Sequence, residues 1–123
     1  EAMQAPALLD RKLGLLDRPI DALILGMGED GHTASLFPCA DNIETLLSEK
    51  EGLKTAFVKP VSAPDDRITL SFTTLTKAHH TFLHFTGALK KEIYQKILSG
   101  DFQVPLGRVF ETSKGNIKLY WAA

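Results

Sequence analysis

The segment DALILGMGEDGHTASLFP, residues 21–38, joins an apolar run to a turn rich in glycine and charge. Residues 20–25 are apolar except for Asp21, which is typical of a strand covered on both faces. The seven residues 26–32 then contain three glycines, two carboxylates and a histidine. Glycine lets the backbone turn tightly and approach a ligand closely. The segment therefore predicts a strand that carries a functional loop at its carboxyl end.

Outside this segment, strand-like and helix-like patterns alternate along the chain. Strands are expected at residues 55–60, 67–72, 80–85 and 116–121, and helices at residues 6–13, 41–52, 73–78 and 87–100. This alternation predicts a layered α/β fold, helix–sheet–helix, with a mostly parallel, Rossmann-like sheet in a single domain over residues 1–123. Ligands of such sheets bind beyond the carboxyl ends of the strands, which is where residues 26–32 fall.

Two of these segments carry the clearest periodicity. Residues 67–72 alternate strictly, so the apolar members are expected on one face of a strand: Ile68, Leu70 and Phe72 opposite Arg67, Thr69 and Ser71. In residues 87–100, apolar residues recur at four-residue spacing and Gly100 follows the last of them. This pattern predicts an amphipathic helix that ends at the glycine.

Composition and charge narrow the class of protein. A formal net charge of -1 gives no basic surface for nucleic acid or an anionic membrane, so neither is expected as a partner. No apolar run approaches the roughly 20 residues that span a bilayer. The single cysteine, Cys39, excludes an internal disulfide and fits a reducing compartment. The first residues show no secretory signal pattern, so a cytoplasmic location is expected.

Gly26, Gly28 and Gly31 also spell the G-x-G-x-x-G pattern of dinucleotide-binding proteins. That pattern opens a long helix, whereas Pro38 interrupts the chain shortly after Gly31. It also requires an acidic residue at the end of a second strand about 20 positions later, and none is found there. A tight turn beside a ligand explains the glycines better.

Asp30 and His32 are the residues with the clearest chemistry. Two positions apart on a loop, a carboxylate can fix the tautomer of an imidazole and stabilise its cation, which suits a general base that takes a proton from water. The structural alternative is a histidine hydrogen-bonded within a turn, with Asp30 capping a short following helix. Residue chemistry alone leaves both interpretations open. Ser35 lacks the G-x-S-x-G surroundings of a nucleophile.

Three segments of the chain resemble those of the 6-phosphogluconolactonase family, in the same order. Residues 23–38, LILGMGEDGHTASLFP, are similar to its signature, and residues 67–78 and 86–92 are similar to two downstream segments. The resemblance implies hydrolysis of the sugar-phosphate lactone 6-phosphoglucono-δ-lactone in the oxidative pentose phosphate pathway, without metal or cofactor. The related glucosamine-6-phosphate deaminases have a glutamate where this chain has Phe37, which favours the lactonase.

The resemblance also assigns roles to residues of the loop. It implies that His32 is the general base and that Asp30 orients its ring. It further implies that nearby glycine N–H groups, those of Gly28 and Gly31, help to bind substrate by holding the developing oxyanion.

Arg67 and Lys90 match cationic positions that the family uses for phosphate. Arg67 begins an alternating strand, where its fork could meet phosphate oxygens. Lys90 falls in the first turn of the predicted helix at 87–100, where the helix dipole disfavours a cation. A phosphate at that helix start would offset the cost, because free N–H groups and the lysine would both face it.

Members of this family are longer, and this chain resembles their carboxyl-terminal half. The glycine- and serine-rich phosphate loop of the preceding half is not found here. A sheet without its other strands is expected to expose an edge or an apolar face, which predicts self-association. Two alternative functions are retained: an amino-sugar-phosphate deaminase or isomerase, and a sugar-phosphate-binding fragment without catalysis.

Overall fold

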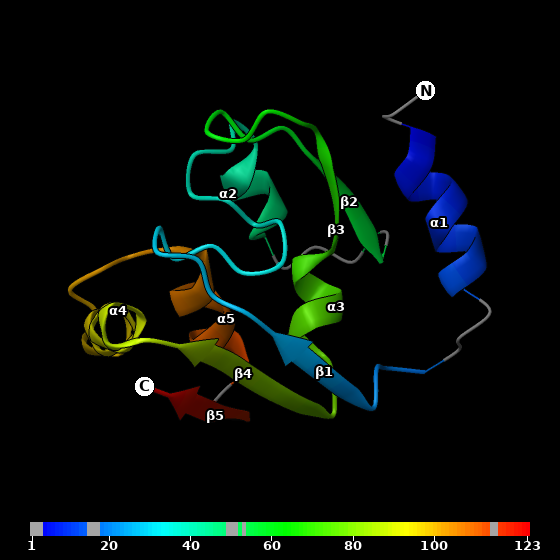
Figure 1. Cartoon of the computed structure of the whole chain (residues 1–123). Helices are drawn as coiled ribbons and strands as arrows, with labels where there is room; N and C mark the ends of the chain where they lie inside the picture. The colour runs from blue at the N-terminus through cyan, green and yellow to red at the C-terminus, as the bar shows by residue number, and fades with distance from the viewer. Residues whose placement is uncertain (1–3, 15–17, 49–51, 53, 114–115) are drawn as a thin grey trace.

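The computed structural model describes residues 4–14, 18–48, 52, 54–113 and 116–123. Its main sheet has three parallel strands in the order β1-β4-β5 (Figure 1). These strands are β1 (Ala22–Leu25), β4 (His80–Thr86) and β5 (Ile117–Ala122). The predicted α/β fold with a mostly parallel sheet is confirmed, and each of these strands coincides with an expected strand segment.

The two remaining strands form a separate antiparallel pair, β2 (Thr55–Val58) with β3 (Arg67–Leu70). Thr69 of β3 is only 5% exposed, whereas Ile68, on the opposite face, is 39% exposed. The expected strand over residues 67–72 is too long, because Ser71 caps helix α3 (Phe72–Thr76) and Phe72 is the first residue of that helix. Within β3, a polar residue rather than Ile68 takes the buried side. Thr69 is tolerated there because its hydroxyl accepts a hydrogen bond from the Ser35 N–H at 3.1 Å.

Helix α1 (Ala5–Leu13) is attached to β2 through one carboxylate. Asp10 accepts hydrogen bonds from the Lys54 N–H at 2.6 Å and from the Thr55 N–H and hydroxyl at 2.9 and 2.8 Å. Pro6 lies in the first turn and Gly14 follows the last residue, as expected for a helix over residues 6–13.

Asp10→Ala is expected to lower the free energy of unfolding by about 2–3 kcal/mol, because the backbone N–H groups of Lys54 and Thr55 lose this acceptor, whereas the Thr55 hydroxyl can still donate to the Pro6 carbonyl. Urea denaturation followed by circular dichroism measures the change. Lys12→Ala, at an exposed position of the same helix, is the control and should change stability by less than about 0.5 kcal/mol. Equal effects of the two substitutions would mean that the Asp10 contacts do not hold α1 in place.

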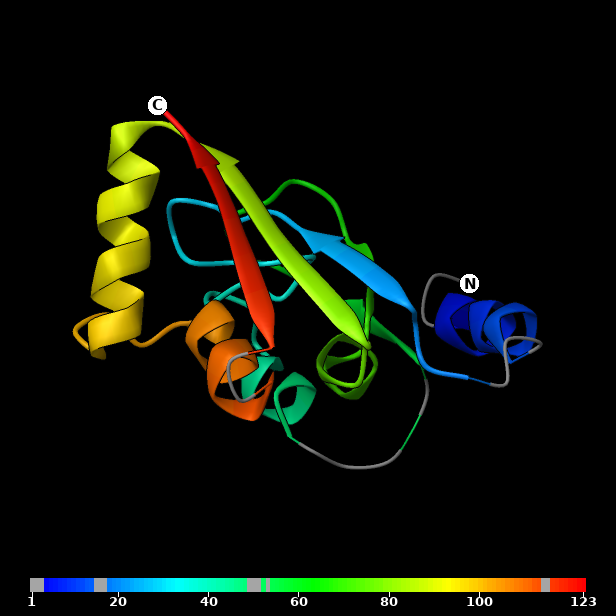
Figure 2. The same ribbon diagram turned by 90° about the horizontal axis from the view of Figure 1, so that it is seen from below.

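Three helices pack their buried side chains against one face of the sheet (Figure 2): α3 (Phe72–Thr76), α4 (Ala88–Ser99) and α5 (Pro105–Ser113). Helix α4 ends at Gly100, whose φ of +83° is left-handed, as predicted. Among the described residues, no helix has the length and apolar character needed to cross a membrane.

The prediction of helices is less accurate in two places. Helix α2 (Ile43–Leu46) is shorter than the expected segment 41–52, of which residues 49–51 lie outside the described residues. The sequence patterns also miss α5, although Pro105 opens it and its buried positions, Leu106 and Val109, have helical spacing. Gly107 within so short a segment weakens the helical signal.

The two faces of the sheet differ sharply in burial. Leu23 and Leu25 are 8% and 4% exposed, whereas Ile24 between them is 75% exposed. Tyr120 is 57% exposed, and its ring centroid lies 6.0 Å from that of Phe82 on the same open face. The expectation of a strand covered on both faces is wrong for β1, because the described helices pack on the opposite side. An exposed apolar face and an edge strand, as the sequence predicts, are both present.

Candidate functional site

The loop after β1 doubles back on the end of that strand. Residues 26–40 form turns and isolated bridges rather than a helix, so the alternative in which Asp30 caps a following helix is wrong. Thr33 is fully buried, and its hydroxyl donates to the Gly26 carbonyl at 2.9 Å. Ala34 has φ +50°, a region that non-glycine residues rarely adopt outside strained functional loops. Thr33, which the sequence patterns do not single out, therefore shapes this loop.

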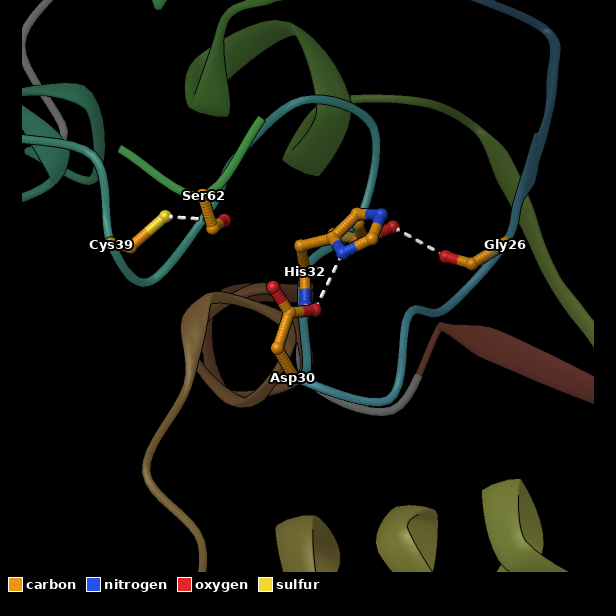
Figure 3. Close-up of polar contacts among 6 residues, drawn as sticks. Gly26, Asp30, His32, Cys39 and Ser62 are labelled. Carbon is orange, nitrogen blue, oxygen red and sulfur yellow. Dashed lines mark hydrogen bonds and ion pairs between the residues drawn. The ribbon is translucent and has the colours of Figure 1, made fainter. Parts of the chain in front are cut away.

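Asp30 and His32 contact each other in the loop (Figure 3). Asp30 Oδ1 lies 2.5 Å from His32 Nδ1 and also accepts the His32 backbone N–H at 3.1 Å. The carboxylate assigns the proton to Nδ1, which leaves Nε2 to accept another. Their side chains are 44% and 32% exposed, so a small substrate can reach them. The pair has the geometry of a base and its orienting carboxylate, and the backbone bond closes a turn at the same time.

The imidazole is also held across its face. Phe37 stacks on His32 with ring centroids 4.4 Å apart and an angle of 29° between the planes. Together with the bond to Asp30, this contact restricts both the position and the tilt of the ring. In the sequence, Phe37 only marks a difference from the deaminases, and the structure adds a supporting role for its ring.

The glycines of the loop act through their lack of a side chain. A Cβ on Gly28 would lie 2.1 Å from His32 Nδ1 and 2.7 Å from Asp30 Oδ1. A Cβ on Gly31, whose φ is +80°, would lie 2.4 Å from a methyl carbon of Val104. The N–H of Gly28 donates to the His32 carbonyl at 2.9 Å, and that of Gly31 donates to the Gly28 carbonyl at 3.0 Å. Both N–H groups are therefore engaged within the loop, which argues against the oxyanion role expected for them.

The β2–β3 pair fixes the other end of the loop. Ala40 forms an isolated bridge with Pro60, and Cys39 Sγ lies 2.9 Å from Ser62 Oγ (Figure 3). The hydrogen bond with Ser62 lowers the pKa of the Cys39 thiol. Because the loop is tied to β1 at one end and to this hairpin at the other, the residues between have a defined geometry.

Comparison with known proteins places this arrangement in a family. A family model described as glucosamine-6-phosphate isomerases/6-phosphogluconolactonase matches residues 1–121. The chain belongs to this family. The 6-phosphogluconolactonases of Neisseria meningitidis serogroup A and Rhizobium meliloti are both 32% identical to it, over 117 and 123 residues. These matches cover 94% and 98% of this chain but 50% and 53% of the relatives, so the chain spans about half the length of the curated relatives it matches.

Solved structures of family members agree with the fold. The crystal structure of a 6-phosphogluconolactonase from Shewanella baltica has a TM-score of 0.89 at 31% identity, over 99% of this chain and 52% of that chain. A 6-phosphogluconolactonase from Trypanosoma cruzi has a TM-score of 0.78 at 26% identity, over 98% of this chain and 49% of that chain. The resemblance inferred from the sequence motifs is therefore confirmed at the level of the family.

Lys90 lies in the first turn of α4, which directly follows β4. Since β4 pairs in parallel with β1, the start of α4 and the His32 loop follow neighbouring strands at the same end of the sheet (Figure 2). Gly87 precedes the helix and has no side chain to cap it, which leaves first-turn N–H groups for a ligand. The neighbouring Lys91 is engaged differently, with its Nζ 4.0 Å from the centroid of the Trp121 ring.

Arg67 is bound by its own loop. Its guanidinium donates to the carbonyls of Asp65 and Asp66 at 3.0 and 3.4 Å and lies 3.8 Å from the Asp65 carboxylate. Arg67 begins β3, which reaches the His32 loop through the bond between Thr69 and Ser35. A phosphate at Arg67 would have to replace these local acceptors, whereas Lys90 stands at the end of the main sheet where the loop also lies.

Proposed function

We propose that the protein containing this chain hydrolyses 6-phosphoglucono-δ-lactone to 6-phosphogluconate, a step of the oxidative pentose phosphate pathway in the cytoplasm. The observation that carries the proposal is the Asp30–His32 pair, held at the carboxyl end of β1 in a chain of the lactonase family. The relatives that resemble the chain over most of its length are named as lactonases, which supports the same activity.

In the proposed reaction, His32 Nε2 takes a proton from water while the water oxygen attacks the lactone carbonyl. Asp30 stabilises the imidazolium that forms, through its bond at Nδ1. The tetrahedral intermediate then collapses with cleavage of the carbon–oxygen bond of the ring. The imidazolium returns its proton to the departing ring oxygen, which leaves a free carboxylic acid and a hydroxyl group. The oxyanion requires donors other than the N–H groups of Gly28 and Gly31, because both are engaged.

The phosphate of the substrate is proposed to bind at Lys90 and the start of α4, with Arg67 as a second contact. The uncapped helix start and the absence of acidic residues in its first turn support this assignment. Arg67 would exchange the carbonyls of Asp65 and Asp66 for phosphate oxygens.

Lys90→Met is expected to raise KM for the lactone about tenfold with a smaller change in kcat, because phosphate binds in both the ground state and the transition state. Lys96→Met, on the same helix but paired with Glu92 at 3.0 Å, is the matched control and should leave KM unchanged. A lactone hydrolysis assay with both variants measures the effect. If the two variants have the same KM, the phosphate is bound elsewhere.

Activity itself is tested by lactone hydrolysis above the spontaneous rate, with the 123-residue chain and with the longer protein that carries it. Ammonia release from glucosamine 6-phosphate would instead identify a deaminase, which Phe37 disfavours because the related deaminases have a glutamate at that position. Saturable binding of 6-phosphogluconate without hydrolysis in either form would identify a binding module.

Self-association through the open face of the sheet stays a prediction, which sedimentation velocity would test.

A further inference from the structure

A surface cavity lies near the start of β1, at the end of the strand opposite to the His32 loop. It has a volume of about 400 Å³, is open to solvent, and is bordered by the end of α1, the residues that lead into β1, the β2–β3 pair and α3. This volume is within the range of small-molecule sites, roughly 300–1,000 Å³. Pro19 and Ile20 line it and precede β1, whereas the loop at residues 26–32 follows β1, so the strand separates the two sites (Figure 1, Figure 2).

The interior of this cavity is mainly apolar. Leu13 comes from α1, Ile20 from the approach to β1, and Leu70 from the end of β3. All three are partly buried, so they offer a surface that a ligand can cover without displacing the core. Burial of an apolar body there would be favoured by about 25 cal/mol per Å² of apolar surface removed from water.

Three cationic side chains line the same cavity: Arg18, Lys54 and Lys77. The described residues that line it include no carboxylate. The Lys54 ammonium donates to the Leu13 carbonyl at 3.1 Å, which keeps its charge at the wall. The ion pair of Arg18 with Asp21, at 3.1 Å, is exposed on both sides and therefore weak, so it competes little with a ligand. The described part of the cavity wall thus combines an apolar floor with cationic side chains.

We propose that this cavity binds a small organic anion with an apolar or aromatic body. The body would lie on Leu13, Ile20 and Leu70, and the acidic group would pair with the cationic side chains. A phosphorylated sugar lacks such a body, so the ligand class differs from the substrate proposed for the His32 loop. The site is independent of that function. Its ligand would connect α1, β1 and α3 and would stabilise the fold by mass action.

The test uses 8-anilinonaphthalene-1-sulfonate, an aromatic anion, titrated into the 123-residue chain and followed by amide-resolved NMR. Shift changes are expected at Arg18, Ile20, Leu70 and residues 73–77, and not at residues 26–32. Lys77→Met and Arg18→Met should each weaken binding about fivefold, as the loss of one partly exposed charge contact would. Lys59→Met, an exposed lysine outside the cavity, is the matched control and should leave the affinity unchanged.

A neutral probe of similar shape, N-phenyl-1-naphthylamine, separates charge recognition from apolar adsorption without any substitution. The proposal expects it to bind at least about fivefold more weakly than the sulfonate. Equal affinities of the two probes would overturn the proposal, and so would shifts confined to the open sheet face at Ile24, Phe82 and Tyr120. The proposal would also be overturned if Lys77→Met and Arg18→Met both bind the sulfonate with unchanged affinity while their spectra stay dispersed.

Discussion

His32→Ala is expected to lower lactone turnover by about 10²- to 10⁴-fold, the usual contribution of a positioned general base. The ring is a third exposed and lies on a loop, so its removal should leave the fold intact. The loss should appear mainly in kcat, because His32 acts on the attacking water rather than on the phosphate. Steady-state lactone hydrolysis by the longer protein, with circular dichroism as the check on folding, measures it.

His84→Ala is the matched control for this experiment. His84 is exposed on the open face of β4 in this chain, whereas His32 lies on the loop after β1, so in an assay of the 123-residue chain its substitution should leave turnover unchanged. The turnover of Asp30→Asn should lie between those of His32→Ala and His84→Ala. An amide can still hydrogen-bond the ring but cannot stabilise the imidazolium as a carboxylate does. Undiminished turnover of His32→Ala would end the assignment of the base.

Gly28→Ala is the second substitution with a large expected effect. The added methyl carbon would lie 2.1 Å from His32 Nδ1, 2.2 Å from Cε1 and 2.7 Å from Asp30 Oδ1, so the pair must separate. Once His32 is displaced and no longer contacts Asp30, it should lose most of its contribution to catalysis, so turnover should fall about 10²- to 10³-fold. The same lactone assay measures the loss, and the histidine ring signals in an NMR spectrum report the displacement directly.

Gly26→Ala provides a close control for this prediction. A Cβ at Gly26 would meet nothing within 4 Å, and the loop should keep its geometry. Its turnover should therefore stay within about twofold of the unsubstituted protein. Should Gly28→Ala behave like Gly26→Ala, the contact between Asp30 and His32 in this structure would not be the one that matters for turnover.

Much of the secondary structure could be predicted because its signals are local. Gly100 ends α4 with a left-handed backbone that glycine adopts without steric cost, and the alternation that begins at Arg67 marks a strand, although the strand ends at Leu70. The pairing of Asp30 with His32 follows from a separation of two residues on a turn. Helix α5 could not be predicted with the same ease, since its short apolar pattern depends on distant residues, such as Gly31, whose carbonyl accepts the Leu106 N–H at 3.3 Å.

The sequence by itself determined the strands of the main sheet, helix α4, the loop after β1 and the family motif that the loop carries. Only the tertiary structure decided that Thr69 faces inward, that Ile24 faces outward, and that the N–H groups of Gly28 and Gly31 are already used. The reason is physical. Propensity, capping and periodicity act within a few residues, whereas burial and hydrogen-bond satisfaction depend on which segments meet across the fold.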